Sequence, residues 1–363
     1  ANAAYFDGLS FFKEQFGQSF TYDEKGNVLS SQDAAKQAES YEYDSNNNMT
    51  KLVDAKGRNF KYTYDSRHNV TSSVSAANCK CTFSYDTYGN PTEGRTVNPA
   101  NENEYIRTTA EYTANGNQIA KVTDALGYSM AYAYNQKDIL ISETDAAGHT
   151  LTYEYNAMNQ LTSMMKNVTV NGQVLTPHVG FGYVNDRLSV IAQNDFIYNM
   201  VYDGFGNLTS TSVEDQGIQT YIYEANNGNV KSKTYGNGVT LSYTYDVFDR
   251  VIATDMASGS NSAVRIYEYS YDHQGNLAVT KDLMNRISYR YFYDMTDRLV
   301  MCQDSLGNSF TYIYDANNNL TSMTVKNSGT TLKTQYVYDA DDRETQTQAK
   351  SKTLTTAYDA LGR

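Results

Sequence analysis

Short runs of alternating aromatic and polar residues recur along the chain. Tyr41-Glu42-Tyr43 and Tyr243-Thr244-Tyr245 are typical, with two rings two positions apart and a polar residue between them. In a β-strand this spacing places both rings on one face, whereas a helix would place them about 200° apart. The pattern therefore predicts strands along most of the chain.

These strands belong to an internal repeat in which an aromatic-x-Tyr-Asp core returns about every 21 residues. The sixteen second tyrosines of the core are Tyr22, Tyr43, Tyr64, Tyr85, Tyr112, Tyr134, Tyr155, Tyr183, Tyr202, Tyr223, Tyr245, Tyr271, Tyr293, Tyr314, Tyr338 and Tyr358. The residue two positions earlier is Tyr in ten units and Phe in three. We predict that residues 1–19 form a lead-in or partial repeat. Residues 20–363 would then form a single array of about sixteen repeats, truncated at its C-terminus, with no second domain.

The residues that follow each second tyrosine predict a tight turn. Asp follows directly in eleven units, including Asp23, Asp44, Asp65 and Asp86, and its side chain is suited to cap turn amides. Fourteen units carry a residue that tolerates positive φ four positions after the tyrosine. These residues are Gly26, Asn47, His68, Gly89, Gly116, Asp138, Asn159, Gly206, Asp249, Gly275, Asp297, Asn318, Asp342 and Gly362. An apolar residue then opens the next run, so each unit reads as a β-hairpin.

A second turn closes each unit, as in Asp54-Ala55-Lys56-Gly57 and Asp304-Ser305-Leu306-Gly307. The longer spacers fall in this second turn, one of them containing Asn171-Gly172, which is a strong hairpin signal. Sixteen hairpins joined edge to edge give about 32 strands, and open sheets of that size curl or close. The expected fold class is all-β, with tandem antiparallel hairpins in one continuous spiral sheet. Tyrosines at equivalent heights are expected to form cross-strand aromatic ladders.

Composition narrows the functional classes. The chain has 34 Tyr, no Trp, and a formal net charge of −12. The acidic balance argues against nucleic acid as a partner, and no apolar run is long enough for membrane insertion. The first ten residues show no signal peptide and no initiator Met, so we expect a piece of a longer protein.

Candidate chemistry is sparse, and we predict no catalytic, cofactor or metal site. The four histidines lie in unrelated contexts, two of them (His68 and His273) inside predicted turns, and no metalloprotease, serine hydrolase or phosphate-loop motif is present. Cys79 and Cys81 form a C-x-C pair that would share one strand face, but a pair without a second ligand cluster favours a structural role, and its redox state is open. Asp-x-x-Gly-Asn turns could offer oxygen ligands to Ca²⁺, but one or two carboxylates per turn favour turn capping instead.

Units such as Tyr41-Glu42-Tyr43-Asp44-Ser45-Asn46-Asn47-Asn48-Met49-Thr50 and the corresponding residues 312–321 resemble the YD/Rhs repeat family over essentially the whole chain. Its members include bacterial Rhs and wall-associated proteins, the BC component of Tc toxins, and teneurins. The resemblance implies a spiral strip of hairpins that wraps into a hollow shell, which in bacterial members can enclose a C-terminal toxin domain. Family shells use more repeats, so we expect a partial, open wall. No proline here follows an Asp, so the family's Asp-Pro self-cleavage site does not carry over.

The function predicted from these observations is non-catalytic: a structural shell segment of a secreted or cell-surface bacterial protein. The parent would enclose or display a C-terminal toxin or effector. The alternative is a carbohydrate-binding or adhesin array that contacts a cell-surface glycan through exposed tyrosines. Against it, the similar aromatic repeats of cell-wall-binding proteins depend on Trp, which is absent here. A stalk or spacer at the cell surface is a third possibility.

Overall fold

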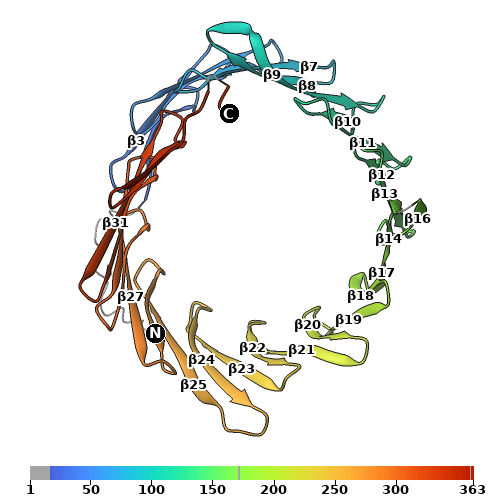
Figure 1. The fold of residues 1–363 in the computed structure, drawn as a ribbon, viewed down its shortest axis with the longest axis vertical. Helices are drawn as coiled ribbons and strands as arrows, with labels where there is room; N and C mark the ends of the chain where they lie inside the picture. Colours follow the sequence, from blue (N-terminus) through green and yellow to red (C-terminus); the bar gives the residue numbers. More distant parts are fainter. Residues whose placement is uncertain (1–16, 171, 360) are drawn as a thin grey trace, which may run out of the picture. The chain divides into compact units, whose positions relative to one another are not determined.

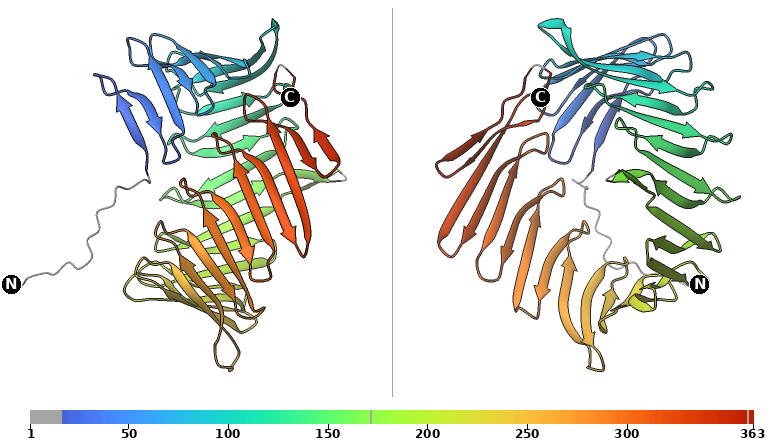
Figure 2. Two further views of the ribbon diagram at one scale, coloured as in Figure 1. Left: turned by 90° about the vertical axis from the view of Figure 1, so that its left-hand side faces the viewer. Right: turned by 45° about the vertical axis from the view of Figure 1, so that its right-hand side comes forward.

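The computed structural model describes residues 17–170, 172–359 and 361–363, and in these residues all regular structure is β-strand. One sheet holds 31 strands, and β15 and β16 form a separate two-stranded sheet. Consecutive strands pair antiparallel in chain order, for example β3 with β4 and β4 with β5 (Figures 1 and 2). The predicted fold class, tandem antiparallel hairpins in one continuous sheet, is confirmed. The described residues contain no helix of the length and apolarity that a membrane crossing requires.

The strands of the first half are β1 (Ser19–Tyr22), β2 (Val28–Gln32), β3 (Ala38–Tyr43), β4 (Met49–Val53), β5 (Asn59–Tyr64), β6 (Val70–Val74), β7 (Lys80–Tyr85), β8 (Pro91–Asn98), β9 (Asn101–Tyr112), β10 (Ile119–Thr123), β11 (Ser129–Tyr134), β12 (Leu140–Thr144), β13 (Thr150–Tyr155), β14 (Leu161–Lys166), β15 (Val168–Val170), β16 (Gln173–Leu175) and β17 (His178–Val184). Those of the second half are β18 (Arg187–Gln193), β19 (Phe196–Tyr202), β20 (Leu208–Val213), β21 (Gln216–Tyr223), β22 (Val230–Tyr235), β23 (Val239–Tyr245), β24 (Val251–Ser258), β25 (Val264–Tyr271), β26 (Leu277–Asp282), β27 (Ile287–Tyr293), β28 (Leu299–Asp304), β29 (Ser309–Tyr314), β30 (Leu320–Asn327), β31 (Thr330–Tyr338), β32 (Glu344–Ala349) and β33 (Lys352–Thr355).

The second tyrosine of the core ends a strand in fourteen units, lies one residue before the end of β17 in the unit of Tyr183, and follows β33 in the unit of Tyr358. The tyrosine–aspartate turn, here the YD turn, therefore lies at one end of each hairpin. The insertions lie at the other end, as expected: the β8–β9 and β24–β25 hairpins are extended there, and β15–β16 is inserted there. Residue 171 of the predicted Asn171-Gly172 turn lies outside the described residues, as do residues 1–16 of the predicted lead-in. The division into residues 1–19 and 20–363 therefore stays a prediction.

A β-bulge recurs at the YD end of the hairpins. Tyr43 pairs with Met49 and Glu42 pairs with Lys51, which leaves Thr50 unpaired. The hydroxyl of Thr50 donates to the carbonyl of Glu42 at 3.3 Å, and Thr162, Thr209, Thr321 and Thr345 make the equivalent bond. Because a bulge raises local twist, one bulge per repeat on the same side bends the strip in one sense.

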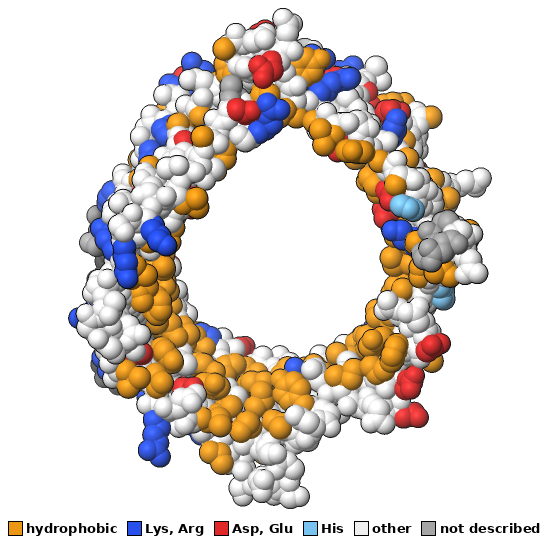
Figure 3. All heavy atoms as spheres, in the orientation of Figure 1, with side chains coloured by type: hydrophobic (Ala, Val, Ile, Leu, Met, Phe, Trp, Pro, Cys, Tyr) orange, Lys and Arg blue, Asp and Glu red, His pale blue; other side chains and the backbone are white. Residues whose placement is uncertain are grey.

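The sheet has little conventional core. The buried hydrophobic residues among those described are Ala34, Val97, Ala253, Ile266 and Leu361, and no large side chain there is fully buried. Along the Tyr-bearing strands, half-buried rings alternate with exposed residues, as in β3 and β5. Over β20–β25, hydrophobic side chains gather on the inner side of the curved strip (Figure 3). Stability therefore depends on backbone hydrogen bonds, turns and half-buried tyrosines more than on a packed interior.

The chain divides into two compact units built from the same repeat. Unit 1 comprises Ala1–Lys80, His273–Asn276 and Arg290–Arg363, and unit 2 comprises Cys81–Asp272 and Leu277–Tyr289. Unit 1 thus brings together repeats from the two ends of the array.

Candidate functional site: turns, tyrosine locks and the clasp

The YD turn is closed by its aspartate. In the first turn, the N–H groups of Lys25 and Asn27 donate to Oδ1 of Asp23 at 2.9 and 2.8 Å, and the Asn27 side chain donates to Oδ2 at 2.8 Å. The backbone closes the same loop through Asp23 N to the carbonyl of Asn27. Asp44, Asp65 and Asp86 cap their turns in the same way. Since these hydrogen bonds favour the ionised carboxylate, they hold the pKa of Asp44 and Asp65 below its ordinary value.

All fourteen residues singled out four positions after the tyrosine have positive φ, from 59° at Asp138 to 96° at Gly206. Gly26, Gly89 and Gly275 have φ of 88°, 91° and 95°. The two units left aside have turns of other lengths. After Tyr183 a two-residue turn has positive φ at Asn185 and Asp186, and after Tyr223 the turn is one residue longer and places Gly228 at 75°.

The second turn uses the same geometry as the YD turn. Asp54 accepts from the N–H groups of Lys56 and Arg58, and the N–H of Gly57 donates to the Asp54 carbonyl. Both ends of this hairpin therefore present an Asp-capped loop, a similarity that the different sequences of the two turns concealed.

In most units the second tyrosine of the core ties its repeat to the one before. Tyr64 donates its hydroxyl to the carbonyl of Met49 at 2.8 Å, and Met49 is the residue that precedes the bulged Thr50. We name this bond the tyrosine lock. It spans 2.8–3.1 Å from Tyr43 to Val28, Tyr64 to Met49, Tyr112 to Pro91, Tyr134 to Ile119, Tyr183 to Leu161, Tyr202 to Leu188, Tyr223 to Leu208, Tyr245 to Val230, Tyr271 to Val251, Tyr314 to Leu299, Tyr338 to Leu320 and Tyr358 to Glu344. Tyr22, Tyr85, Tyr155 and Tyr293 end β1, β7, β13 and β27 at the equivalent position.

The expected cross-strand aromatic ladder is wrong in its geometry. The ring pairs that the described residues form, such as Tyr221 with Tyr223 at 6.4 Å, lie two positions apart on one strand. Tyr-bearing strands alternate with return strands, so neighbouring tyrosine rows are about 9.5 Å apart. A phenol hydroxyl reaches the strand between them, and a hydrogen bond replaces ring contact.

Within unit 1, a second turn lies against two YD turns from the other end of the array. Lys56 bridges them, with its Nζ 2.5 Å from Oδ2 of Asp315 and 3.1 Å from Oδ1 of Asp342. Arg58 donates to Asp342 through both terminal nitrogens, at 3.0 and 2.5 Å, and to Asp54 through Nε at 2.7 Å. We name this cluster the clasp, and its further members are Asn317, which donates to Asp54 and Asp342, and Asn319, which donates to Asp342.

A second turn next along the chain, Ser75–Cys79, contacts the same YD turn as Arg58 does and extends the clasp. The Asp341 side chain accepts from the hydroxyl of Ser75 at 2.7 Å and from the N–H of Ala77 at 2.8 Å. Burial alone would raise the pKa of Asp342, but hydrogen bonds from Arg58, Asn317 and Lys56 outweigh it and hold that pKa far below its usual range. The clasp is therefore a paired, ionised cluster at neutral pH.

The residues considered for metal binding do not converge. Cys79 lies in the turn that precedes β7 rather than on the strand, because its carbonyl closes the turn with the N–H of Ser75, so a shared strand face with Cys81 is wrong. In the part of the chain that is described, no three His, Cys, Asp or Glu side chains are grouped to hold a metal ion. His68 and His149 lie in separate turns, where their ring nitrogens contact Asn48 and Asp145.

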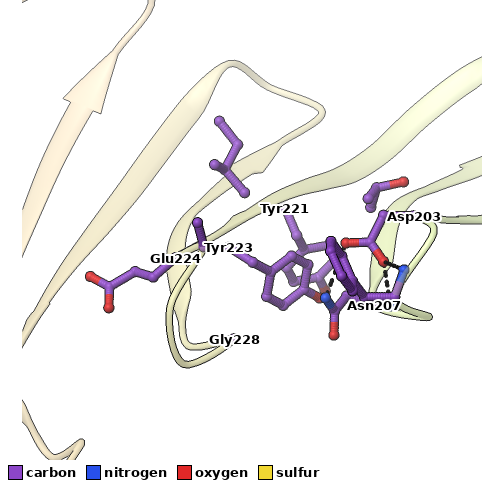
Figure 4. Close-up of a pocket in the computed structure, with 10 residues that line it drawn as sticks. Asp203, Asn207, Tyr221, Tyr223, Glu224 and Gly228 are labelled. Atoms are coloured by element: carbon purple, nitrogen blue, oxygen red, sulfur yellow. Dashed lines mark hydrogen bonds between the residues drawn. The ribbon is translucent and has the colours of Figure 1, made fainter.

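In unit 2, an open groove of about 580 Å³ lies between two consecutive YD turns. It is lined by Asp203, Phe205, Asn207, Thr209, Tyr221, Ile222, Tyr223, Glu224, Ala225 and Gly228. Phe205 is 91% exposed and Ile222 is 60% exposed. Tyr221 and Tyr223 lie between the Asp203–Asn207 pair and Glu224, whose carboxylate points away from them (Figure 4). The groove is thus an apolar recess with carboxylates at its rims.

Known proteins show the same repeat and the same fold. The family described as Teneurin YD-shell matches residues 182–362, and the family described as RHS Repeat matches residues 22–58, 43–78 and 140–167. No curated protein matches the chain. The crystal structure of TcdB2-TccC3 is similar with a TM-score of 0.63 and 12% identity over 90% of this chain and 21% of that chain.

Two further structures agree. TcdB2-TccC3 without its hypervariable C-terminal region has a TM-score of 0.60 at 12% identity, covering 95% of this chain and 24% of that one. The Photorhabdus luminescens Tc holotoxin pore has a TM-score of 0.58 at 14% identity, covering 90% and 22%. At these identities the similarity shows the fold, and the chain spans less than a quarter of the length of the chains it resembles.

Proposed function

The chain belongs to the YD/RHS-repeat family, and on that premise we propose that it is a non-catalytic wall segment of a hollow β-hairpin shell. The observation that carries the proposal is the tyrosine lock, which joins consecutive hairpins through a side chain that each repeat supplies. Locks of this kind hold a thin sheet together without a second layer, and a wall of that kind leaves its concave face free.

We also propose that the parent protein is secreted or displayed at a bacterial cell surface and that the shell encloses a C-terminal effector. Two observations support this. A similar protein, TcdB2-TccC3, has a hypervariable C-terminal region. The inner side of the strip over β20–β25 is hydrophobic (Figure 3), which suits contact with an enclosed polypeptide.

The carbohydrate-binding alternative is less favoured by the positions of the tyrosines. The second tyrosines of the repeats are half-buried except Tyr22, and twelve of them donate their hydroxyls to backbone carbonyls, as Tyr245 does to Val230. Those hydroxyls are thereby occupied, whereas sugar recognition needs exposed rings and available polar groups.

Small-angle X-ray scattering of the chain tests the shell proposal. A curved wall predicts a compact or bowl-like envelope, whereas a long straight rod would reject a shell and favour a stalk. The effector proposal has a separate test, limited proteolysis of the full gene product. Protection of its C-terminal segment in the wild type, and loss of protection when Tyr245→Phe and Tyr271→Phe remove two locks, is the expected result.

A further inference from the structure

In the clasp, the turn at the end of one hairpin binds between the turns of two other hairpins. Lys56 occupies the tip of a second turn and bridges two consecutive YD turns, those of Asp315 and Asp342. The groove in unit 2 lies at the equivalent place, between the consecutive YD turns of Asp203 and Glu224. Asp203 and Asp315 cap their turns identically, through Asn207 and Asn319. The groove is therefore a receiving site of the same type.

The side chains at that site differ in polarity. The tip of the first YD turn is Asn317 in the clasp and Phe205 in the groove, and the positive-φ residue of the next turn is Asp342 in the clasp and Gly228 in the groove. The second replacement removes the carboxylate that contacts both Lys56 and Arg58. The first replaces an amide that contacts Asp54 and Asp342 with an exposed ring, so the recess is more apolar than the clasp. A charged tip would be poorly paired there, and an apolar tip would bury both surfaces.

The chain carries apolar tips of the required kind. Leu126 and Leu306 occupy the position of Lys56 in their own second turns, Asp124–Tyr128 and Asp304–Asn308, and are 82% and 69% exposed. Tyr128, beside Leu126, is 62% exposed. Isolated leucines on a surface are ordinary, but leucines at the tips of loops that match a receiving site elsewhere in the chain form a complementary pair.

We propose that the groove between the Asp203 and Glu224 turns binds a second copy of this chain through the leucine tip of a second turn, Leu126 or Leu306. The contact is heterologous, because the two copies use different surfaces. The YD ends suit the receiving role because the insertions lie at the opposite hairpin ends, as in β8–β9 and β24–β25.

Sedimentation velocity over a range of protein concentrations tests the contact. The wild type is expected to sediment as a 40.7 kDa monomer when dilute and to gain weight-average mass as its concentration rises. Phe205→Asp should weaken self-association at least tenfold, since it places a charge in the recess, and Leu126→Asp with Leu306→Asp should do the same from the other side. Val264→Asp, at a residue 63% exposed and outside the groove, is the matched control.

Mixing the variants gives the sharpest result. Phe205→Asp keeps its leucine tips, and the double leucine variant keeps its groove, so the two should form a 1:1 complex that neither forms alone. Far-UV circular dichroism confirms that each variant is folded. A monomer at every wild-type concentration, association that Phe205→Asp leaves unchanged, or no complex on mixing would each overturn the proposal.

Discussion

The YD turns of the clasp in unit 1 and two YD turns of unit 2 share one repeat but differ in their tips. In the clasp the tip residues are polar and engaged: Asn317 donates to Asp54 at 2.8 Å, and Asp341 accepts from Ser75 at 2.7 Å. In the Asp203 and Asp246 turns of unit 2 the same tip position holds Phe205 and Phe248, which are 91% and 74% exposed. The backbone geometry is the same in both units, since the N–H of Asn317 and that of Phe205 each donate to their turn aspartate at 2.9 Å.

The difference shows which part of the repeat carries specificity. A turn needs the Asp cap, the positive-φ residue and the backbone N–H of the tip, and none of these depends on the tip side chain. The tip is therefore free to vary, and its polarity determines what a hairpin end can contact. The lock and the turn backbone build the sheet, whereas the tip side chains determine which turns contact one another.

Alkaline titration is expected to have the largest effect, and it should not distinguish the units. Burial is the main factor that raises the pKa of tyrosines in both, among them Tyr64 and Tyr338 in unit 1 and Tyr245 in unit 2, and it raises the pKa of Tyr153 to about 12. A raised folded pKa contributes stability that is complete below the unfolded pKa near 10 and is lost as pH rises through the folded value. We expect cooperative unfolding between about pH 10 and 12. Circular dichroism and phenolate absorbance should change together, and phenolate formation near pH 10 in a folded chain would contradict this.

Arg58→Met is expected to open the clasp and therefore to destabilise unit 1 alone. The substitution removes the guanidinium group that pairs with both Asp54 and Asp342, two carboxylates of limited exposure. The expected loss in the free energy of unfolding is about 2 kcal/mol. Hydrogen exchange should rise in residues 54–58 and 339–343 while unit 2 stays protected. High salt should reproduce part of the effect, since partly exposed ion pairs are screened.

Arg250→Met is the matched control for the clasp. Arg250 pairs with Asp246 in its own turn at 2.6 Å, in the same Asp-to-Arg spacing that Arg58 and Asp54 use. This pair lies within one turn and, in the part of the chain that is described, has no partner from a distant turn, so its loss should destabilise the chain less than Arg58→Met does. Equal losses for the two variants would mean that the contact with the distant YD turns adds nothing.

Gly275→Val tests the turn backbone, which both units share. Gly275 has φ of 95°, which a β-branched residue resists, so the expected destabilisation exceeds about 1 kcal/mol. Gly206→Val in unit 2, at φ of 96°, should cost a similar amount. Gly204→Val is the control, because Gly204 lies in the same turn as Gly206 outside the left-handed region and faces open space. Thermal melts that showed no change for Gly275→Val would show that this residue does not constrain the turn.

The repeat could be predicted from the sequence because it depends on local chemistry, whereas the contacts between distant turns could not. The positive-φ positions could be recognised because few residue types tolerate that backbone, and Asp44 was recognisable as a cap from its place after Tyr43. The lock was missed because a tyrosine pattern does not show which carbonyl its hydroxyl reaches. The clasp joins residues more than 260 positions apart, and its only signal was a second turn with two basic residues, Lys56 and Arg58, opposite an acidic YD turn.

Tyr245→Phe is expected to have the smallest effect of the series, and it tests the feature that both units share. The substitution keeps the ring and removes the 2.8 Å bond to the carbonyl of Val230. That carbonyl precedes the bulge, where the ladder is interrupted, so the expected loss is about 1 kcal/mol. Tyr243→Phe, in the first ring of the same strand, leaves the lock intact and should cost less. If urea unfolding gave equal losses for the two variants, hydroxyl burial and not the lock would explain the tyrosine pattern. If Tyr338→Phe in unit 1 matched Tyr245→Phe, the lock would contribute equally with and without the clasp.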